Sequence, residues 1–316
     1  MNGLSELELM SRRMLKGAKF SKIEPQIPQS KNLGLYIHIP FCKMLCPFCP
    51  YNRYPWHRKW GKPYIAAVKK ELDIYKKMLP DVEIDTLYVG GGTPTVMIDG
   101  LVKILAYAKD SFPISGDICV EANPDDLDDS TLSKLRGIGV KKISIGVQSF
   151  DDDILRAIGR RSHDGETARN ALKLAMAQDF DCVNADFMFS LPGQSLSQVL
   201  SDLETAVDTG VHQITIYPLL LFPYTKTAKD VKNGKIALPN SKQEKRMYDE
   251  IVRFLTSSGY EMCSVWSFAK RGVGKYGSIE REEYIGVGAG AMSMTNEFTY
   301  ANTFPVAEYI QAVGNG

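Results

Sequence analysis

The sequence lacks a long apolar run, an excess of charge of either sign, and an abundance of histidine. No run of 18 apolar residues occurs among its 316 residues, so we expect no transmembrane helix and no membrane partner. With 38 basic and 37 acidic residues, it also lacks the basic footprint of a nucleic-acid-binding protein. Because the N-terminal stretch has no apolar signal core, we expect a cytoplasmic location.

Cysteine is scarce and unevenly distributed. Three of the six cysteines fall within eight residues, at Cys42, Cys46 and Cys49, with the spacing C-x3-C-x2-C. In a cytoplasmic chain, such a cluster indicates a metal site rather than disulfides. The other three are isolated in or beside apolar runs, where we expect buried small side chains: Cys119, Cys182 and Cys263.

Two kinds of metal site are compatible with the cysteine triplet. Thiolates bind iron–sulfur clusters, and three of them leave one iron open to a small molecule. A zinc site is the alternative, with His38 or His57 as the fourth ligand. Structural zinc sites favour paired C-x2-C units, so the single triplet favours the iron–sulfur cluster.

Strand-like apolar runs alternate with helical segments. The predicted strands are Leu35–Ile39, Thr86–Val89, Asp117–Glu121, Lys142–Val147, Cys182–Phe189 and Gln213–Tyr217. The predicted helices are Lys62–Met78, Ile98–Lys109, Ser130–Arg136 with Ser130 as its N-cap, Asp151–Ile158, Glu166–Ala177 and Ser197–Asp208. This alternation indicates βα units around a parallel sheet.

Chemically distinctive residues mark the carboxyl end of every predicted strand. Cysteines follow the first strand and glycines the second, while Glu121 ends the third and Gln148 follows the fourth. An open doubly wound sheet would bind its ligand at one switch point, whereas a barrel collects polar residues at many strand ends. We therefore predict an α/β fold built on a partial (β/α)6 TIM-type barrel.

The chain divides into three predicted segments. Residues 1–34 are an N-terminal extension, and residues 35–240 are the barrel core. The amphipathic helix Lys242–Leu255 and a Gly-rich aromatic tail predict a small α+β C-terminal subdomain, residues 241–316, that closes the barrel.

Several strand-end residues have both a functional and an ordinary interpretation. The motif Gly90–Pro94 can let backbone amides approach a ligand, or it can be a simple turn. Glu121 can accept hydrogen bonds from ribose hydroxyls, or it can be a surface carboxylate. Arg160 can clamp a carboxylate, or it can be a solvated charge at a helix end. Asp186 lies among apolar neighbours and needs a polar partner.

Taken in order, these motifs resemble the radical S-adenosylmethionine superfamily. The branch they resemble is typified by oxygen-independent coproporphyrinogen III oxidase and a related heme chaperone, and the matching motifs are YIHIPFC, GGGTPT, VEANP, SIGVQSF, LPGQ and YIGVGAGA. The resemblance implies a 4Fe-4S cluster whose open iron binds S-adenosylmethionine. It further implies a low-potential electron donor, such as flavodoxin or ferredoxin, and a 5′-deoxyadenosyl radical.

The resemblance also assigns roles to individual residues. It makes Cys42, Cys46 and Cys49 the cluster ligands and catalytic residues. It implies that Tyr36, Gly91 and Glu121 contact the cluster-bound S-adenosylmethionine. Positions that match contacts to a second S-adenosylmethionine are Phe48, Gly92, Thr93, Gln148, Arg160, Asp186 and Leu220. Whether one or two molecules bind stays open, and the tail motif Gly286–Ala291 is expected to close over the adenine region.

The sequence departs from both relatives that typify this branch. The oxidase has a fourth cysteine where this chain has Tyr51, and it has a longer N-terminal segment. The chaperone has a histidine before its tail glycines, whereas no histidine follows His212 here. Cys263 is then the remaining candidate for a heme ligand in that region.

The expected function is therefore a radical S-adenosylmethionine oxidoreductase or methyltransferase that acts on a small tetrapyrrole-like molecule, such as a porphyrin or heme. The stretch Tyr217–Pro223 suits a flat apolar substrate, although it can equally pack in the core. Two alternatives stay open. One is a heme-binding protein like the chaperone, and the other is a methyltransferase or cyclopropanase of the same branch that uses two S-adenosylmethionine molecules.

Overall fold

The structure is a computed structural model that describes residues 28, 30–277, 283–295 and 298–315. Its strands are β1 (Asn32–Ile39), β2 (Phe41–Cys42), β3 (Tyr54–Pro55), β4 (Glu83–Gly91), β5 (Ile114–Ala122), β6 (Val140–Gln148), β7 (Cys182–Phe189), β8 (Gln213–Pro218), β9 (Tyr260–Met262), β10 (Ser267–Lys270), β11 (Tyr284–Val287), β12 (Met292–Met294) and β13 (Thr299–Ala301). Its helices are α2 (Arg58–Met78), α3 (Ile98–Ser111), α4 (Asp129–Gly137), α5 (Asp152–Ala157), α6 (Gly165–Met176), α7 (Leu196–Thr209), α8 (Lys226–Lys232), α9 (Ser241–Ser257) and α10 (Val306–Asn315), with 3-10 turns η1 (Pro94–Met97) and η2 (Pro124–Asp126).

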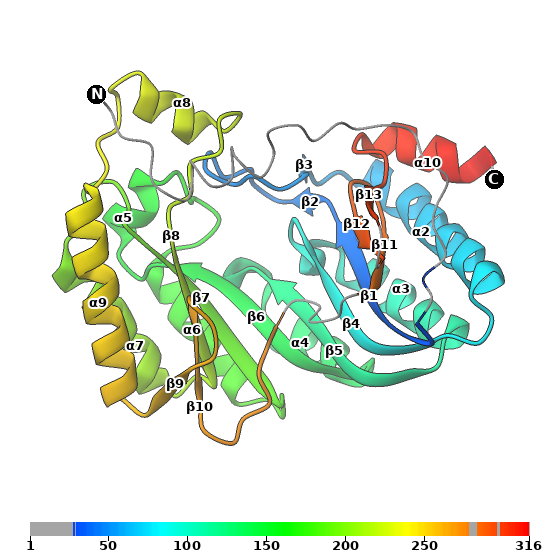
Figure 1. The fold of residues 1–316 in the computed structure, drawn as a ribbon, viewed down its shortest axis with the longest axis horizontal. Coiled ribbons are helices and arrows are strands. Elements are labelled where there is room, and N and C mark those ends of the chain that lie inside the picture. The colour runs from blue at the N-terminus through cyan, green and yellow to red at the C-terminus, as the bar shows by residue number, and fades with distance from the viewer. Residues whose placement is uncertain (1–27, 29, 278–282, 296–297, 316) are drawn as a thin grey trace.

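Eleven strands form one curved sheet. Their order is β13-β12-β11-β1-β4-β5-β6-β7-β8-β10-β9. The strands from β1 to β8 in this order pair in parallel with their neighbours, and each is followed in the chain by at least one helix. Figure 1 shows the sheet as an open arc with the helices α2, α3, α4, α6 and α7 outside it. The predicted α/β partial barrel is therefore confirmed.

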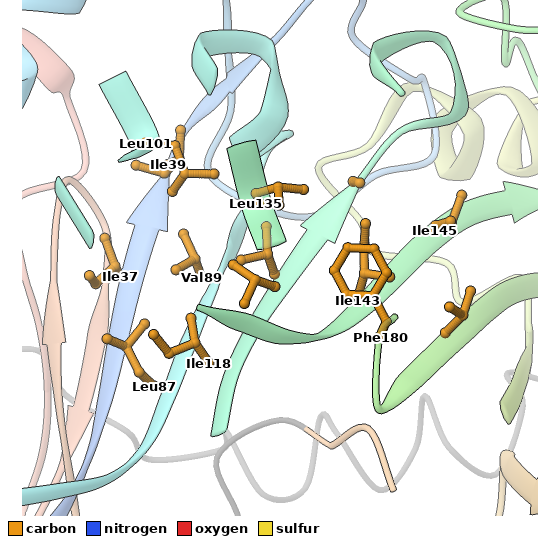
Figure 2. Close-up of a cluster of buried hydrophobic side chains, with 14 of the residues drawn as sticks. Ile37, Ile39, Leu87, Val89, Leu101, Ile118, Leu135, Ile143, Ile145 and Phe180 are labelled. Atoms are coloured by element: carbon orange, nitrogen blue, oxygen red, sulfur yellow. The ribbon is translucent and has the colours of Figure 1, made fainter. Parts of the chain in front are cut away.

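The core lies between the sheet and its outer layer of helices. Leu35, Ile37 and Ile39 alternate along β1, and each is fully buried. Successive strand side chains point to opposite faces, so this alternation directs one face to the helices and the other to the barrel interior. Figure 2 shows the strand side chains of this core meeting Leu101 of α3 and Leu135 of α4. The strand side chains on the opposite face point into the barrel interior, where they can contribute to a binding site.

Residues beyond 240 extend both edges of the same sheet. β10 pairs with β8 in antiparallel fashion, and β11 pairs with β1 in parallel. The division of the chain at residue 240 stays a prediction, and most of the predicted N-terminal extension lies outside the described residues. Across the part of the chain that the structure describes, no helix is long and apolar enough to cross a membrane.

Two local predictions were wrong. The α4 helix begins at Asp129, and its N-cap is Asp128, whose carboxylate accepts from the Thr131 amide at 2.7 Å. The predicted cap, Ser130, lies inside the helix. Of the isolated cysteines, Cys119 and Cys182 are buried as expected, whereas Cys263 is only half-buried. The first prediction failed because Asp128 and Ser130 compete for the N-cap position of α4, and the Asp128 carboxylate occupies it.

Candidate functional site

A cavity of ≈ 660 Å³ opens at the carboxyl ends of the parallel strands. Twelve of the thirteen predicted site residues line it: Cys42, Cys46, Phe48, Cys49, Gly91, Gly92, Thr93, Glu121, Gln148, Arg160, Asp186 and Leu220. The exception is Tyr36, whose hydroxyl lies 2.8 Å from His38 Nδ1 and does not line the cavity. The fold thus gathers residues from six strand ends around one space, while their individual roles stay predictions.

The cysteine loop (residues 43–53) joins two short strands that the sequence did not predict. β2 and β3 pair in parallel, with Phe41 beside Tyr54 and Cys42 beside Pro55. The Tyr54 amide also donates to the Pro40 carbonyl at 2.6 Å. The pair closes the base of the loop, and all three clustered cysteines line the same cavity.

The glycine motif lies against the start of the cysteine loop. The Gly92 amide donates to the Ile39 carbonyl at 2.8 Å, and the Thr93 amide donates to the Phe41 carbonyl at 2.7 Å. A Cβ atom on Gly92 would lie 2.7 Å from that same Phe41 oxygen. Gly91 adopts a φ of 113°, which favours glycine. The motif therefore serves the close packing of β4 against the cysteine loop, as well as lining the cavity.

The clustered thiols are poorly solvated. Burial raises the pKa of Cys42 to about 11, although a hydrogen bond from Thr93 opposes the shift. Burial also raises the pKa of Cys49. Desolvated thiols that converge on one space lose their protons readily only to a metal, because metal binding supplies the compensating positive charge. The donor set therefore fits a thiolate-bound cluster.

Arg160 connects the cysteine loop to the barrel wall. Its Nη1 donates to Cys46 Sγ at 3.3 Å, and its Nη2 donates to the Gly146 carbonyl at 2.8 Å and to the Asn123 side-chain oxygen. Its Nε is buried and has no hydrogen-bond partner among the described residues. A buried donor without a partner costs about 1–3 kcal/mol. Arg160 therefore braces the cysteine loop through its two terminal nitrogens, while its Nε is shielded from solvent.

Glu121 lies in the cavity wall between β4 and β5. Its carboxylate accepts from the Tyr88 hydroxyl at 2.5 Å and from the Gly91 amide at 3.1 Å. Desolvation raises the pKa of Glu121, although these two hydrogen bonds oppose the shift. The carboxylate thus links the glycine motif to the third parallel strand and can still accept a further hydrogen bond from a ligand hydroxyl.

Asp186 is the second carboxylate of the cavity, and the polar partner that its sequence context required is present. Ser144 donates to it at 2.7 Å and Asn184 at 2.8 Å. Desolvation raises the pKa of Asp186 to about 7, against the effect of these donors. A carboxyl group with such a pKa can accept or donate a hydrogen bond to a ligand near neutral pH.

Gln148 ends β6 in a strained conformation. Its φ of 69° lies in the left-handed region that non-glycine residues seldom adopt, and its side-chain oxygen accepts from the Tyr217 hydroxyl at 3.1 Å. Ser190, just beyond β7, has a φ of 59°. Such strain costs about 1–3 kcal/mol and is concentrated at functional sites. Both strained residues lie at the carboxyl ends of parallel strands, where the cavity opens.

Sequence reasoning missed the tail residue Tyr276, which lines the cavity. Its backbone amide and carbonyl form two hydrogen bonds of 2.8 Å with the Gln213 side chain. Its ring packs against that of Tyr88, with 5.6 Å between ring centroids. No local pattern indicates this placement, because it depends on a polar contact over 63 residues of sequence.

The zinc alternative placed His38 or His57 beside the cysteines. His38 has both ring nitrogens engaged, one with the Tyr36 hydroxyl and one with the Asn52 carbonyl. His57 is exposed at the N-cap of α2. Among residues that the structure describes, no group of three or more His, Cys, Asp or Glu side chains could hold a single metal ion. An iron–sulfur cluster is wider than a single ion and takes its ligands farther apart.

The contact of the tail motif Gly286–Ala291 with the adenine region stays a prediction. None of its residues lines the cavity. Instead, its backbone meets His38, Tyr64 and the side chain of Asn52. Cys263, the remaining candidate heme ligand in the tail, also lies outside the cavity lining.

Comparisons with known proteins agree with this arrangement. The family model of the radical SAM superfamily matches residues 36–206. Heme chaperone HemW of Bacillus subtilis is 33% identical over 288 residues, which cover 88% of this chain and 75% of that protein. Oxygen-independent coproporphyrinogen III oxidase of Paracoccus denitrificans is 28% identical over 287 residues, which cover 84% of this chain and 63% of that protein.

A solved structure extends the comparison to the fold. The coproporphyrinogen III oxidase of Escherichia coli superposes with a TM-score of 0.80 at 25% identity, over 90% of this chain and 69% of that one. The chain therefore belongs to the radical SAM superfamily, in the branch that contains these heme chaperones and coproporphyrinogen III oxidases.

Proposed function

We propose that this chain is a radical S-adenosylmethionine enzyme that acts on a small tetrapyrrole-like molecule, a porphyrin or a heme. In this proposal, Cys42, Cys46 and Cys49 hold a 4Fe-4S cluster whose fourth iron binds S-adenosylmethionine. When bound, the cluster supplies one electron that cleaves S-adenosylmethionine to methionine and a 5′-deoxyadenosyl radical. The proposal includes a cytoplasmic location and a low-potential donor such as flavodoxin or ferredoxin.

One observation carries this proposal: the three thiols and an apolar lip line the same cavity. The lip comprises the cavity-lining residues of the stretch Tyr217–Phe222, which begins in the last two residues of β8 and continues beyond that strand. The cavity volume of ≈ 660 Å³ falls in the range of small-molecule sites. A reactive group formed beside the thiols would meet an apolar substrate held against the apolar lip.

The polar residues of the cavity have proposed roles in binding S-adenosylmethionine. Gly91, Gly92 and the carboxylate of Glu121 line the cavity together with the cysteines, and the methionine and ribose groups would bind beside them. Arg160, which lines the cavity, would contact a carboxylate of the ligand through its guanidinium group. Tyr36 would act indirectly, because its hydroxyl contacts His38 instead of the cavity. The remaining predicted contacts, including Asp186 and Gln148, leave room in the proposal for a second molecule.

Heme carriage without turnover is the second candidate function. The observation that favours it is the naming of the relatives from Bacillus subtilis and Lactococcus lactis, which are 33% and 30% identical, as heme chaperones. A heme in the cavity of this chain would take no ligand from Cys263, which lies outside the lining.

Product analysis distinguishes the two candidates. The protein is reconstituted with iron and sulfide without air, reduced with dithionite, and incubated with methyl-deuterated S-adenosylmethionine and either a porphyrin or a heme. The enzyme proposal predicts 5′-deoxyadenosine, methionine and a substrate of altered mass, and deuterium in that product would identify methyl transfer. Stoichiometric heme binding without any 5′-deoxyadenosine would instead support carriage and contradict the proposed enzyme.

A further inference from the structure

The cysteine loop is tied from behind to the tail of the chain. Asn52, next to last in the loop, donates from Nδ2 to the Ala289 carbonyl at 3.0 Å and to the Phe304 carbonyl at 2.9 Å. Its own carbonyl accepts from His38 Nε2 at 2.9 Å. One residue thus joins the loop, strand β1 and the tail segment, which we define as residues 284–295 and 298–304.

The glycines of the tail motif permit this contact. Gly290 has a φ of +75°, and a Cβ atom there would lie 2.6 Å from Asn52 Nδ2. Gly288 has a φ of +108°, and its Cβ atom would lie 2.5 Å from the His38 carbonyl oxygen. Both positions combine a left-handed backbone with a close approach that excludes any side chain. The motif therefore serves the docking of the tail segment behind the cysteine loop.

The tail segment is held from its other side by α2. Glu71 accepts from the Gly288 amide at 2.9 Å, from the Asn302 side chain at 2.6 Å and from the Tyr309 hydroxyl at 2.6 Å. Tyr64, which lies two turns before Glu71 in α2, accepts from the Ala289 amide at 2.9 Å. These buried hydrogen bonds give the tail segment a fixed position, against which the Asn52 amide is held.

A short brace carries the position of Asn52 into the loop. The next residue, Arg53, donates from Nη2 to the Cys46 carbonyl at 2.5 Å. The Cys49 amide also donates to that carbonyl, at 3.3 Å. The exit of the loop and the two last cysteines are therefore linked by hydrogen bonds inside the loop.

We propose that Asn52 is a positioning residue for the cluster, and that it couples the geometry of the three thiols to the docked tail segment. This inference rests on the proposed cluster site. Two donors on one amide group face two carbonyl oxygens, so the function of Asn52 depends on donation and not on side-chain volume. Loss of these donors frees the loop exit and exposes the cluster to removal of its iron.

The test compares Asn52→Ala and Asn52→Asp with the wild type after anaerobic reconstitution. An iron chelator is added, and the loss of the brown cluster absorbance is followed with time. We expect iron release about tenfold faster in both variants, which corresponds to about 1.4 kcal/mol, because both hydrogen bonds donated by the Asn52 amide are lost. Asn52→Asp keeps the size of the side chain but sets an acceptor against two carbonyl oxygens. Wild-type release by Asn52→Asp would overturn the proposal.

The matched control is Asn233→Ala, because Asn233 is exposed after α8 and far along the chain from the loop. It should release iron at the wild-type rate. Thermal unfolding of the cluster-free proteins separates positioning from general destabilisation. Two lost hydrogen bonds should lower the melting temperature by a few degrees, and iron release that becomes faster only at temperatures where the variants begin to unfold would contradict the proposal.

A double variant tests the coupling to the tail segment. Glu71→Gln weakens the support of the tail segment from α2, so its effect on iron release should overlap with that of Asn52→Ala rather than add to it. Strict additivity of the two effects on iron release would show that Glu71 and Asn52 do not act through the same contacts. If the wild type itself bound no iron, the proposed cluster site would fail, whereas equal release by wild type and Asn52→Ala would overturn this inference alone.

Discussion

The cavity side and the rear side of the cysteine loop satisfy their polar groups in different ways. On the rear side, His38, Asn52 and Glu71 each make two or more hydrogen bonds within the chain. On the cavity side, Arg160 keeps a buried nitrogen without a partner, and burial raises the pKa of the Cys42 thiol. The rear side is thus joined by hydrogen bonds within the chain, whereas the cavity side retains an unpartnered donor and desolvated thiols. A binding site is precise when the residues that contact the ligand are held in place by packing and hydrogen bonds behind them.

The largest effect should come from removing a thiol on the cavity side. Cys46→Ala should lose the cluster and all cleavage of S-adenosylmethionine, because two thiolates cannot hold a four-iron cluster open at a single corner. The control is Cys263→Ala, which removes a half-buried thiol outside the cavity. Iron and sulfide analysis checks both variants. Cleavage retained by Cys46→Ala would show that the ligands are wrongly assigned.

A smaller effect should follow from a substitution at the boundary between the two sides. In Gly91→Ala, the new Cβ atom would lie 2.5 Å from the His38 ring at a backbone φ of +113°. We expect a loss of about 3 kcal/mol in the free energy of unfolding, measured with urea on the cluster-free protein. Gly137→Ala has nothing within 4 Å of its Cβ atom and should change stability by less than about 1 kcal/mol. Equal urea midpoints for Gly91→Ala and Gly137→Ala would refute the close packing of Gly91 against the His38 ring.

The rear side should make stability depend on pH through Glu71. Burial raises the pKa of Glu71 from 4.5 to about 7, so the folded chain holds this proton more tightly than the unfolded chain. Stability therefore falls as pH rises between these values, by up to about 3 kcal/mol. Glu71→Gln removes this dependence, and its disadvantage relative to the wild type should shrink between about pH 5 and about pH 8. If the urea midpoints of the wild type and Glu71→Gln differed by the same amount across this pH range, the raised pKa of Glu71 would be contradicted.

The smallest effect should come from a polar contact on the cavity side. Tyr217→Phe removes the hydroxyl that donates to Gln148 but keeps the ring in the apolar lip. We expect the free energy of unfolding to fall by about 1 kcal/mol or less, with unchanged iron content. Loss of the cluster in this variant would mean that the cavity wall supports the cysteine loop as strongly as the rear side does.

The two sides also differ in how far the sequence predicts them. The residues of the cavity side follow directly after apolar strands, and the carboxyl ends of parallel strands converge, so their gathering could be predicted. The rear side depends on contacts such as the one between Asn52 and Ala289, which are 237 residues apart and follow no periodic pattern. The β2–β3 pair was missed because two residues per strand give no alternation to detect.

The central claim is that three thiolates, one at the end of β2 and two in the cysteine loop, hold a cluster with one open iron at the cavity. Electron paramagnetic resonance of the dithionite-reduced protein, recorded with and without S-adenosylmethionine, tests it most directly. The account predicts a signal of a reduced 4Fe-4S cluster that changes when S-adenosylmethionine is added and is absent from Cys46→Ala. A cluster signal that S-adenosylmethionine leaves unaltered, or protein that takes up no iron at all, would contradict it.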